Sequence, residues 1–349
     1  MTRHMDWVLL AISLLVILGG AELFTNGVEW IGEGFGLSEG AVGSVLAAVG
    51  TALPETILPI IAIISGQSAG EEIGIGAILG APFMLTTLAM VVIAMAVIVA
   101  GRGGRRGLTL RIDSGVIGQD LGTFLVMYGL AVVAGLLHVK AIDYGLAVVL
   151  FVSYGYYVRR HFQSPGGARL ETEVGGEIKP LYVWGWLGRV RRGSAPWAKD
   201  ASVAAPFVQV AIALGMIVGG AELFVHAVDS ISRTLGVPPL AFSLLLAPIA
   251  TELPEKFNSV LWIRRGKDTL AMGNMTGAMV FQSSFPVSVG LLLTPWELRD
   301  EALVGALVAL VAGSVLYLQL RLRQRLTGPA LLAQGILYLG YVGYVFTKL

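Results

Sequence analysis

Cysteine is absent from this sequence, and charged residues make up only 13% of its 349 residues. Without cysteine the chain has no disulfides and no thiolate ligands for a metal. An ordinary soluble domain carries about 25% charged residues, so the scarcity of charge argues against a soluble globular protein. The net charge of +1 gives no reason to expect nucleic acid as a partner, and we expect none.

Long apolar runs are what the sequence has in abundance. Hydrophobic residues make up 55% of the chain, and apolar stretches of 18 or more residues are typical of bilayer-spanning helices. The first stretch is too long for a cleavable signal peptide and lacks an A-x-A site, so we expect it to be a span. We predict an all-α polytopic membrane protein with about ten transmembrane helices, at residues 7–29, 40–64, 74–100, 115–137, 141–159, 204–228, 239–263, 270–293, 301–320 and 329–347.

The positive charges fall mainly on one side of these spans. Eighteen Lys and Arg residues follow the third, fifth, seventh and ninth spans, whereas five lie near the termini or in the other loops. Positively charged loops stay cytoplasmic. We therefore expect a multi-pass protein of the cell (cytoplasmic) membrane, with both termini outside and residues 161–203 as a cytoplasmic loop.

Three motifs occur twice in the same order, which indicates an internal repeat. The matching pairs are residues 19–24 with 219–224, 51–55 with 251–255, and 76–81 with 273–278. Five spans separate the copies, and because five is odd the second copy enters the membrane upside down, as in many secondary transporters. We expect a first five-helix repeat at 1–160 and a second, inverted one at 204–349.

The motifs Thr51–Glu55 and Thr251–Glu255 each place a proline and a glutamate inside an apolar span. A proline lacks an N–H and frees the carbonyl four residues earlier, while the threonine and glutamate at i and i+4 share one helix face. Carboxylate, hydroxyl and carbonyl oxygens are ligands of hard cations. The predicted ion-binding oxygens, with the two glutamates as metal ligands, belong to Gly50, Thr51, Glu55, Ala250, Thr251 and Glu255.

A structural role is the alternative explanation for parts of these motifs. Prolines in membrane helices often only kink them, and threonines often bond back to their own helix. A glutamate at the bilayer centre, however, costs about 3 kcal/mol or more. Two glutamates at repeat-related positions therefore favour a functional site.

These residues resemble the sodium/calcium exchanger membrane family of the calcium/cation antiporter superfamily. Its signature is two alpha repeats, each with a G-T-S-x-P-E helix followed by a G-N-x-x-G-S-N helix; residues 50–55 and 250–255 match the first element, and residues 273–278 match the second. The resemblance covers nearly the whole chain. It implies ten helices with the termini outside, no cofactor, no evident protein partner, and exchange of calcium for sodium or protons within the lipid bilayer.

The chain departs from the family pattern, which makes it a divergent member. The resemblance implies further ligands at Asn274 and Gln282, but the position that corresponds to Gln282 in the first repeat is Leu85. The serine after the motif threonine is Ala52 in one copy and Glu252 in the other. We expect that the complete multi-ion site of the family is not preserved.

Lys256 is the one basic residue that belongs to neither side of this charge count, and it lies within a predicted span. Glu252 and Lys256 stand at i and i+4 with the acid N-terminal, the favourable helical arrangement. Either the two merely neutralise each other, or the ammonium occupies or borders a cation site. With all groups ionised, Glu55, Glu252, Glu255 and Lys256 leave a formal charge of −2, which suits one divalent cation or exchanging protons.

Two further features fall outside this motif. The Gly19-Gly20 and Gly219-Gly220 pairs permit close helix approach, and the nearby Glu22 and Glu222 are interpreted as peripheral carboxylates on the first and sixth spans. Asp120 in the fourth span is expected to be structural.

Two other classes of function were weighed. An enzyme is not expected, because the sequence has no H-E-x-x-H motif, four scattered histidines and no Gly-rich phosphate loop. A transport-inactive relative with a sensor or regulatory role is the stronger alternative, since ligands are missing and Lys256 is present. The preferred hypothesis is an alternating-access cation antiporter.

Overall fold

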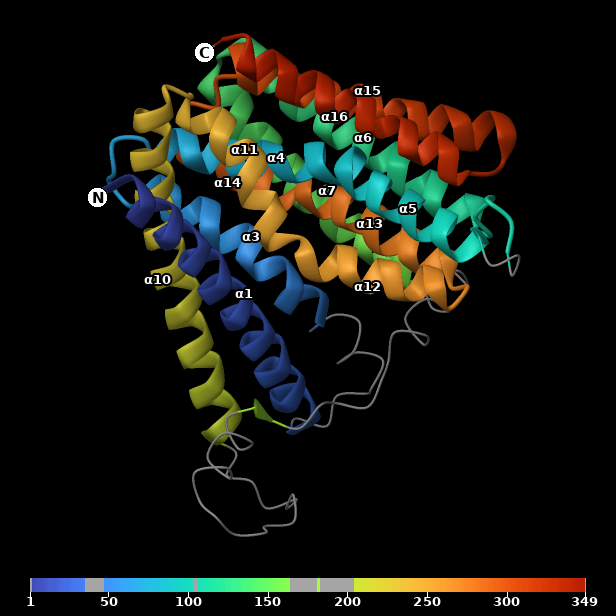
Figure 1. The fold of residues 1–349 in the computed structure, drawn as a ribbon, viewed down its shortest axis with the longest axis horizontal. Helices are drawn as coiled ribbons and strands as arrows, with labels where there is room; N and C mark the ends of the chain where they lie inside the picture. Colours follow the sequence, from blue (N-terminus) through green and yellow to red (C-terminus); the bar gives the residue numbers. More distant parts are fainter. Residues whose placement is uncertain (1, 35–46, 103–105, 164–180, 183–203, 349) are drawn as a thin grey trace.

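The computed structural model describes residues 2–34, 47–102, 106–163, 181–182 and 204–348, and within these ranges the chain is all-helical apart from one isolated bridge between Thr109 and Thr327. Figure 1 shows the helices in their order along the chain. They are α1 (Thr2–Gly34), α3 (Ala47–Ile64), α4 (Gly70–Thr86), α5 (Leu88–Arg102), α6 (Ser114–Leu137), α7 (Lys140–Gln163), α10 (Ala204–Leu235), α11 (Pro239–Thr251), α12 (Leu253–Arg264), α13 (Asp268–Gln282), α14 (Phe285–Leu293), α15 (Asp300–Arg323) and α16 (Gly328–Phe346).

Eight stretches of the described chain are long and apolar enough to cross a membrane. Eight of the ten predicted spans coincide with these stretches. The other two, at 40–64 and 239–263, contain the shorter apolar helices Pro54–Ile64 and Pro239–Ile249, and residues 40–46 lie outside the described ranges. The prediction of an all-helical membrane protein is confirmed, while the total of ten spans stays a prediction.

Three predicted spans are interrupted rather than continuous, and the one at 239–263 is divided between α11 and α12. The span at 74–100 consists of α4 and α5, which meet at Thr87 with φ −113° and ψ −86°. The span at 270–293 consists of α13 and α14, with Ser283 and Ser284 between them. Hydroxyls satisfy carbonyls near each break: Thr87 Oγ1 donates to Phe83 at 2.5 Å, and Ser284 Oγ donates to Val280 at 2.8 Å.

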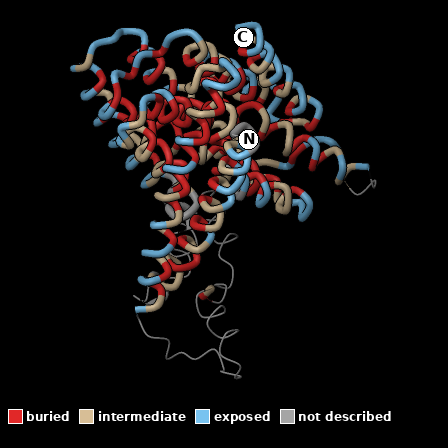
Figure 2. Tube along the Cα trace, turned by 60° about the vertical axis from the view of Figure 1, so that its left-hand side comes forward, coloured by how far each residue is buried: buried red, intermediate tan, exposed pale blue. Residues whose placement is uncertain are grey.

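Helix α4 forms the centre of the bundle. Every residue from Ile73 to Thr86 is buried, and the helix packs against α3, α11, α13 and α15. Figure 2 shows the buried positions gathered in the body of the molecule, with exposed positions on its outer helices. The contact with α11 is close because a Cβ at Gly80 would lie 2.3 Å from the carbonyl oxygen of Leu244 and 2.8 Å from Pro248.

Helices α1 and α10 pack side by side along one edge of the bundle (Figure 1). Their contact is reciprocal: a Cβ at Gly20 would lie 2.9 Å from Ile217, and one at Gly220 would lie 2.8 Å from Ile17. The predicted close approach is therefore confirmed for the second glycine of each pair. No atom of a neighbouring residue lies within 4 Å of a Cβ at Gly219, so that glycine is not needed for packing.

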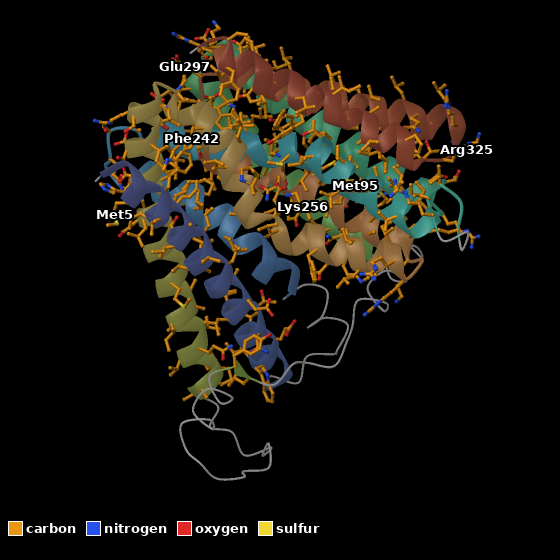
Figure 3. All side chains as sticks on the ribbon, in the orientation of Figure 1. Met5, Met95, Phe242, Lys256, Glu297 and Arg325 are labelled. Atoms are coloured by element: carbon orange, nitrogen blue, oxygen red, sulfur yellow. The ribbon has the colours of Figure 1, made fainter. Side chains whose placement is uncertain are left out.

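The two described ends of the chain lie on one side of the bundle, and the loop that joins α15 to α16 lies on the other (Figure 1). In Figure 3, Arg325 lies at the end opposite Met5 and Glu297. We call the end that carries Arg325 the basic end. There Arg106 forms a two-pronged ion pair with the buried Asp268, with N–O distances of 2.8 and 2.6 Å, which joins the α5–α6 loop to the start of α13.

The reciprocal glycine contact predicts a difference between adjacent positions. Gly220→Ala should destabilise the protein by about 1–3 kcal/mol because the methyl group overpacks the α1–α10 contact. Gly219→Ala, which meets nothing, should leave stability unchanged or slightly raised, since alanine favours a helix over glycine. Unfolding of the purified protein in detergent measures both, and equal effects of the two substitutions would contradict the packing described here.

Candidate functional site

Glu55 and Gln282 come from opposite halves of the sequence and meet in the interior. Glu55 lies on α3 and is 7% exposed; Gln282 is the last residue of α13 and is 1% exposed. The Gln282 amide Nε2 donates a hydrogen bond to Glu55 Oε2. The oxygen of the same amide group, Gln282 Oε1, is buried and accepts no hydrogen bond from the described residues. A carboxylate and an available carbonyl-type oxygen therefore lie together at a protein-enclosed position.

The first motif does not break its helix. Pro54 lies inside α3, which continues without interruption from Ala47 to Ile64. Thr56 Oγ1 donates to the carbonyl of Ala52 at 2.9 Å, so this hydroxyl is used within the helix. Gly50 and Thr51 lie on the same helix, but the side chain of Thr51 is outside the described part, and its role as a ligand stays a prediction.

The second motif does break its helix. Helix α11 ends at Thr251 and α12 begins at Leu253, with Glu252 between them at φ −94° and ψ 7°. Thr251 Oγ1 donates to the carbonyl of Ala247 at 3.2 Å, so its hydroxyl bonds back to its own helix. The side chains of Ala250 and Glu255 lie outside the described part, and the ligand roles of these two residues stay predictions.

Glu252 and Lys256 form an ion pair across this break. Lys256 Nζ lies 2.7 Å from Glu252 Oε2 and 3.5 Å from the carbonyl oxygen of Pro248. The side chain of Lys256 is 9% exposed and that of Glu252 is fully buried. The predicted pairing at i and i+4 is therefore present. Glu252 Oε1 is buried and accepts no hydrogen bond within the described residues. The pair holds one positive and one negative charge in the interior, and one carboxylate oxygen remains available there.

Asn274 connects two helices of the candidate site. Its Nδ2 donates to Ser259 Oγ on α12 at 3.2 Å, and Ser259 Oγ donates in turn to the carbonyl of Ala271 on α13 at 3.3 Å. Nothing in the sequence marks Ser259 as part of the site, because a lone serine in a span carries no signal of its own. The contact shows that Asn274 helps to fix α13 against α12.

The first repeat supplies little polar chemistry from its second motif helix. Leu85, at the position that corresponds to Gln282, is fully buried on α4. Among the described side chains, no group of three or more His, Asp or Glu residues could hold a metal ion. The candidate site is therefore asymmetric, with its described polar groups on α3, the α11–α12 break and α13.

Asp120 belongs to a separate buried cluster. Its carboxylate accepts hydrogen bonds from the hydroxyls of Tyr157 at 2.8 Å and Thr276 at 2.6 Å, which link α6 to α7 and α13. These contacts support the structural role that was expected for Asp120. Glu22 and Glu222 are exposed on α1 and α10, and Tyr182 donates to Glu22 at 2.7 Å.

The buried ion pair predicts strong coupling between its members. Lys256→Met should destabilise the protein by about 3–5 kcal/mol because it leaves Glu252 buried without its counter-ion. Glu252→Leu should have an effect of similar size, and the double variant should be less destabilised than either single variant. Equilibrium unfolding in detergent measures this cycle.

The matched control is the exposed pair of Glu297 and Arg299, which has the same 2.7 Å separation but side chains that are 42% and 67% exposed. Glu297→Gln should cost at most about 1 kcal/mol. Additive effects of the two buried substitutions would show that the Glu252–Lys256 pair does not stabilise the fold in the way proposed.

Comparisons with known proteins show the family and the fold of the chain. The sequence model of the family described as sodium/calcium exchanger protein matches residues 5–162 and 205–348. The chain is 24% identical over 346 residues to the protein named "Putative antiporter CaxA" of Alkalimonas amylolytica, and the alignment covers 96% of each chain.

Solved structures show the same fold. A crystal structure of the H+/Ca2+ exchanger CAX superposes with a TM-score of 0.67 and 15% identity, covering 98% of this chain and 86% of that one. A structure of the sodium-calcium exchanger NCX_Mj superposes with a TM-score of 0.54 and 21% identity, covering 97% of each chain. Since the family model spans both halves and most of the sequence, the chain belongs to the sodium/calcium exchanger protein family.

Proposed function

We propose that this protein is a secondary active antiporter that exchanges a cation, with calcium as the first candidate, for sodium or protons by alternating access. The observation that carries the proposal is the buried contact between Glu55 and Gln282, which joins α3 of the first half to α13 of the second. A buried carboxylate in a membrane span is expensive. A partner from the opposite half makes the carboxylate sensitive to relative movement of the two halves.

The proposed architecture is ten transmembrane helices in two inverted five-helix repeats, 1–160 and 204–349, joined by the cytoplasmic loop 161–203. The reciprocal contacts of Gly20 with Ile217 and of Gly220 with Ile17 support this architecture. At an offset of 200 residues, Gly20 corresponds to Gly220 and Ile17 corresponds to Ile217, so the two contacts are copies of each other. Arg325 lies at the end opposite Met5 (Figure 3), and positively charged loops stay cytoplasmic. This arrangement supports an outside location for both termini in the cell membrane.

In this proposal Glu55 and Glu255 are the cation ligands and proton acceptors. Oxygens of Gly50, Thr51, Ala250 and Thr251 complete the shell, and Glu252, Asn274 and Gln282 are ligands of second rank. Gln282 Oε1 and Glu252 Oε1 support these roles, since buried acceptors that receive no hydrogen bond from the described residues suit a cation.

The charge balance of the site favours few ions per cycle. Lys256 already neutralises Glu252 at 2.7 Å, so the ammonium acts as a tethered cation in place of a mobile one. Glu55 and Glu255 then balance one divalent cation or two protons. The solved structures of similar fold include both an H+/Ca2+ exchanger and a sodium-calcium exchanger. The loss of ligands at Leu85 favours proton coupling here.

Calcium transport into proteoliposomes tests the proposal directly. Radiolabelled calcium should accumulate under an imposed proton gradient or an imposed sodium gradient, and Glu55→Gln should reduce the rate at least about 10-fold because the central carboxylate is lost. Glu222→Gln removes an exposed glutamate from α10 and should leave the rate unchanged. Wild-type rates in Glu55→Gln would refute the role of this carboxylate.

The same assay separates two roles for Lys256. If the wild type transports no calcium under either gradient but Lys256→Ala does, then the lysine has closed the calcium site, and the natural cargo is another cation. If Lys256→Ala instead changes which gradient drives uptake, the ammonium replaces a coupling ion.

A regulatory, transport-inactive relative is the second candidate, because the Glu252–Lys256 pair is self-neutralised. Cation-dependent stability distinguishes the two. An ion-binding antiporter should gain about 2.7 kcal/mol at a cation concentration 100 times the dissociation constant, and Glu55→Gln should lose that gain. Thermal unfolding in calcium, sodium and buffers of different pH measures this, and a flat response together with absent transport would favour the regulatory role.

A further inference from the structure

A groove of about 630 Å³ lies on the side of the bundle between α6, α7 and α15, away from the candidate ion site. Its floor is one stripe of α6 that runs from Ser114 to Leu130. The stripe includes Gly118 and Gly122, whose missing side chains leave the floor low. From Gly115 to Leu130 the stripe rises about 23 Å, which is most of the roughly 30 Å hydrocarbon thickness of a bilayer.

The groove changes in character along its length. The end of the groove near Leu130 is apolar, and its side chains are exposed. Val126 is 64% exposed, Leu130 40% and Val149 50%. Its other end is polar and basic, and is lined by Arg160, Arg321, Gln324, Ser114 and Gln119. Among the described residues, no acidic side chain lines the groove.

The two arginines lie near the basic end of the bundle. Arg160 is three residues before the end of α7, and Arg321 is two residues before the end of α15. Arg321 is held against the groove wall: its Nε donates to the hydroxyl of Tyr317 at 3.0 Å, and its guanidinium lies 5.4 Å from the centre of the Tyr317 ring. Within the described chain, no carboxylate forms an ion pair with either arginine.

We infer that this groove binds an anionic phospholipid of the cytoplasmic leaflet, with the phosphate between Arg160 and Arg321 and an acyl chain along the α6 stripe. Charge complementarity supports this occupant, because two arginines without carboxylate partners lie at the end where positive loops meet anionic lipid headgroups. An apolar channel that continues from a basic end fits a lipid, whereas a free phosphate would use only the basic end.

The first test compares lipids on the purified full-length protein in detergent, by native mass spectrometry. Phosphatidylglycerol should remain bound at concentrations at which phosphatidylcholine with the same acyl chains does not. In the double variant Arg160→Gln/Arg321→Gln, the affinity for phosphatidylglycerol should fall about 30-fold, because both basic side chains near the phosphate are lost. The control Arg323→Gln/Arg325→Gln removes two exposed arginines of the same end that do not line the groove, and it should retain the lipid.

Equal loss in both double variants would overturn the site and leave only a general attraction to the basic end. Equal binding of phosphatidylcholine, or equal thermal stabilisation by soluble glycerol 3-phosphate, would also overturn it, the latter in favour of a phosphate site.

A groove-filling variant keeps the test decisive if the arginine variant fails to fold. A Cβ at Gly118 would meet its nearest neighbour, Leu320, at 3.8 Å, an ordinary contact, so Gly118→Leu should fold while it fills the groove. This variant should lose bound phosphatidylglycerol and its stabilising effect while the basic residues remain. Wild-type retention of the lipid in Gly118→Leu would show that the groove is not where the lipid binds.

Discussion

The absence of water from the hydrocarbon core is the constraint on which the rest of this structure depends. Every backbone group that a helix break exposes, and every charge inside a span, must find its partner within the protein. At the break at Thr87, that residue's own hydroxyl donates a hydrogen bond to a backbone carbonyl. After Gln282, serine hydroxyls donate to backbone carbonyls in the same way. Asp268 at the basic end is matched by Arg106 in the same way.

The same constraint links the packing at the centre to the candidate site. Gly80 lets α4 approach α11 so closely that its backbone reaches Pro248. The carbonyl of Pro248 in turn accepts a hydrogen bond from Lys256, whose ammonium is paired with Glu252 at the end of α11. The close contact at Gly80 and the buried ion pair therefore meet at the same residue, Pro248. Movement of α11 relative to α4 would disturb both.

Local sequence rules predicted the features that depend on neighbours in the chain. The Glu252–Lys256 pair follows from i,i+4 spacing, and the close approach at Gly20 and Gly220 follows from the small residues. The break at Thr87 had no such signal, because neither glycine nor proline stands at the junction. Nothing local shows that Glu55 meets Gln282, since 227 residues separate them; only the repeat and the family resemblance brought Gln282 into the site.

Gln282 suits an ion-exchange site better than a residue that only donates or only accepts hydrogen bonds. A glutamine side chain carries both an N–H donor and a carbonyl acceptor. In the structure its N–H group is directed at the carboxylate of Glu55, which supplies a partner for a buried acid when no cation is bound. Its oxygen lies buried and accepts no hydrogen bond from the part of the chain that the structure describes. A cation between the two side chains would therefore find a carboxylate and an amide oxygen after a small rotation of the amide. A carboxylate at this position would add a second negative charge that attracts a further cation, and a leucine would leave Glu55 without this donor. An amide at position 282 therefore fits a site that alternates between an empty and an occupied state with few ions per cycle.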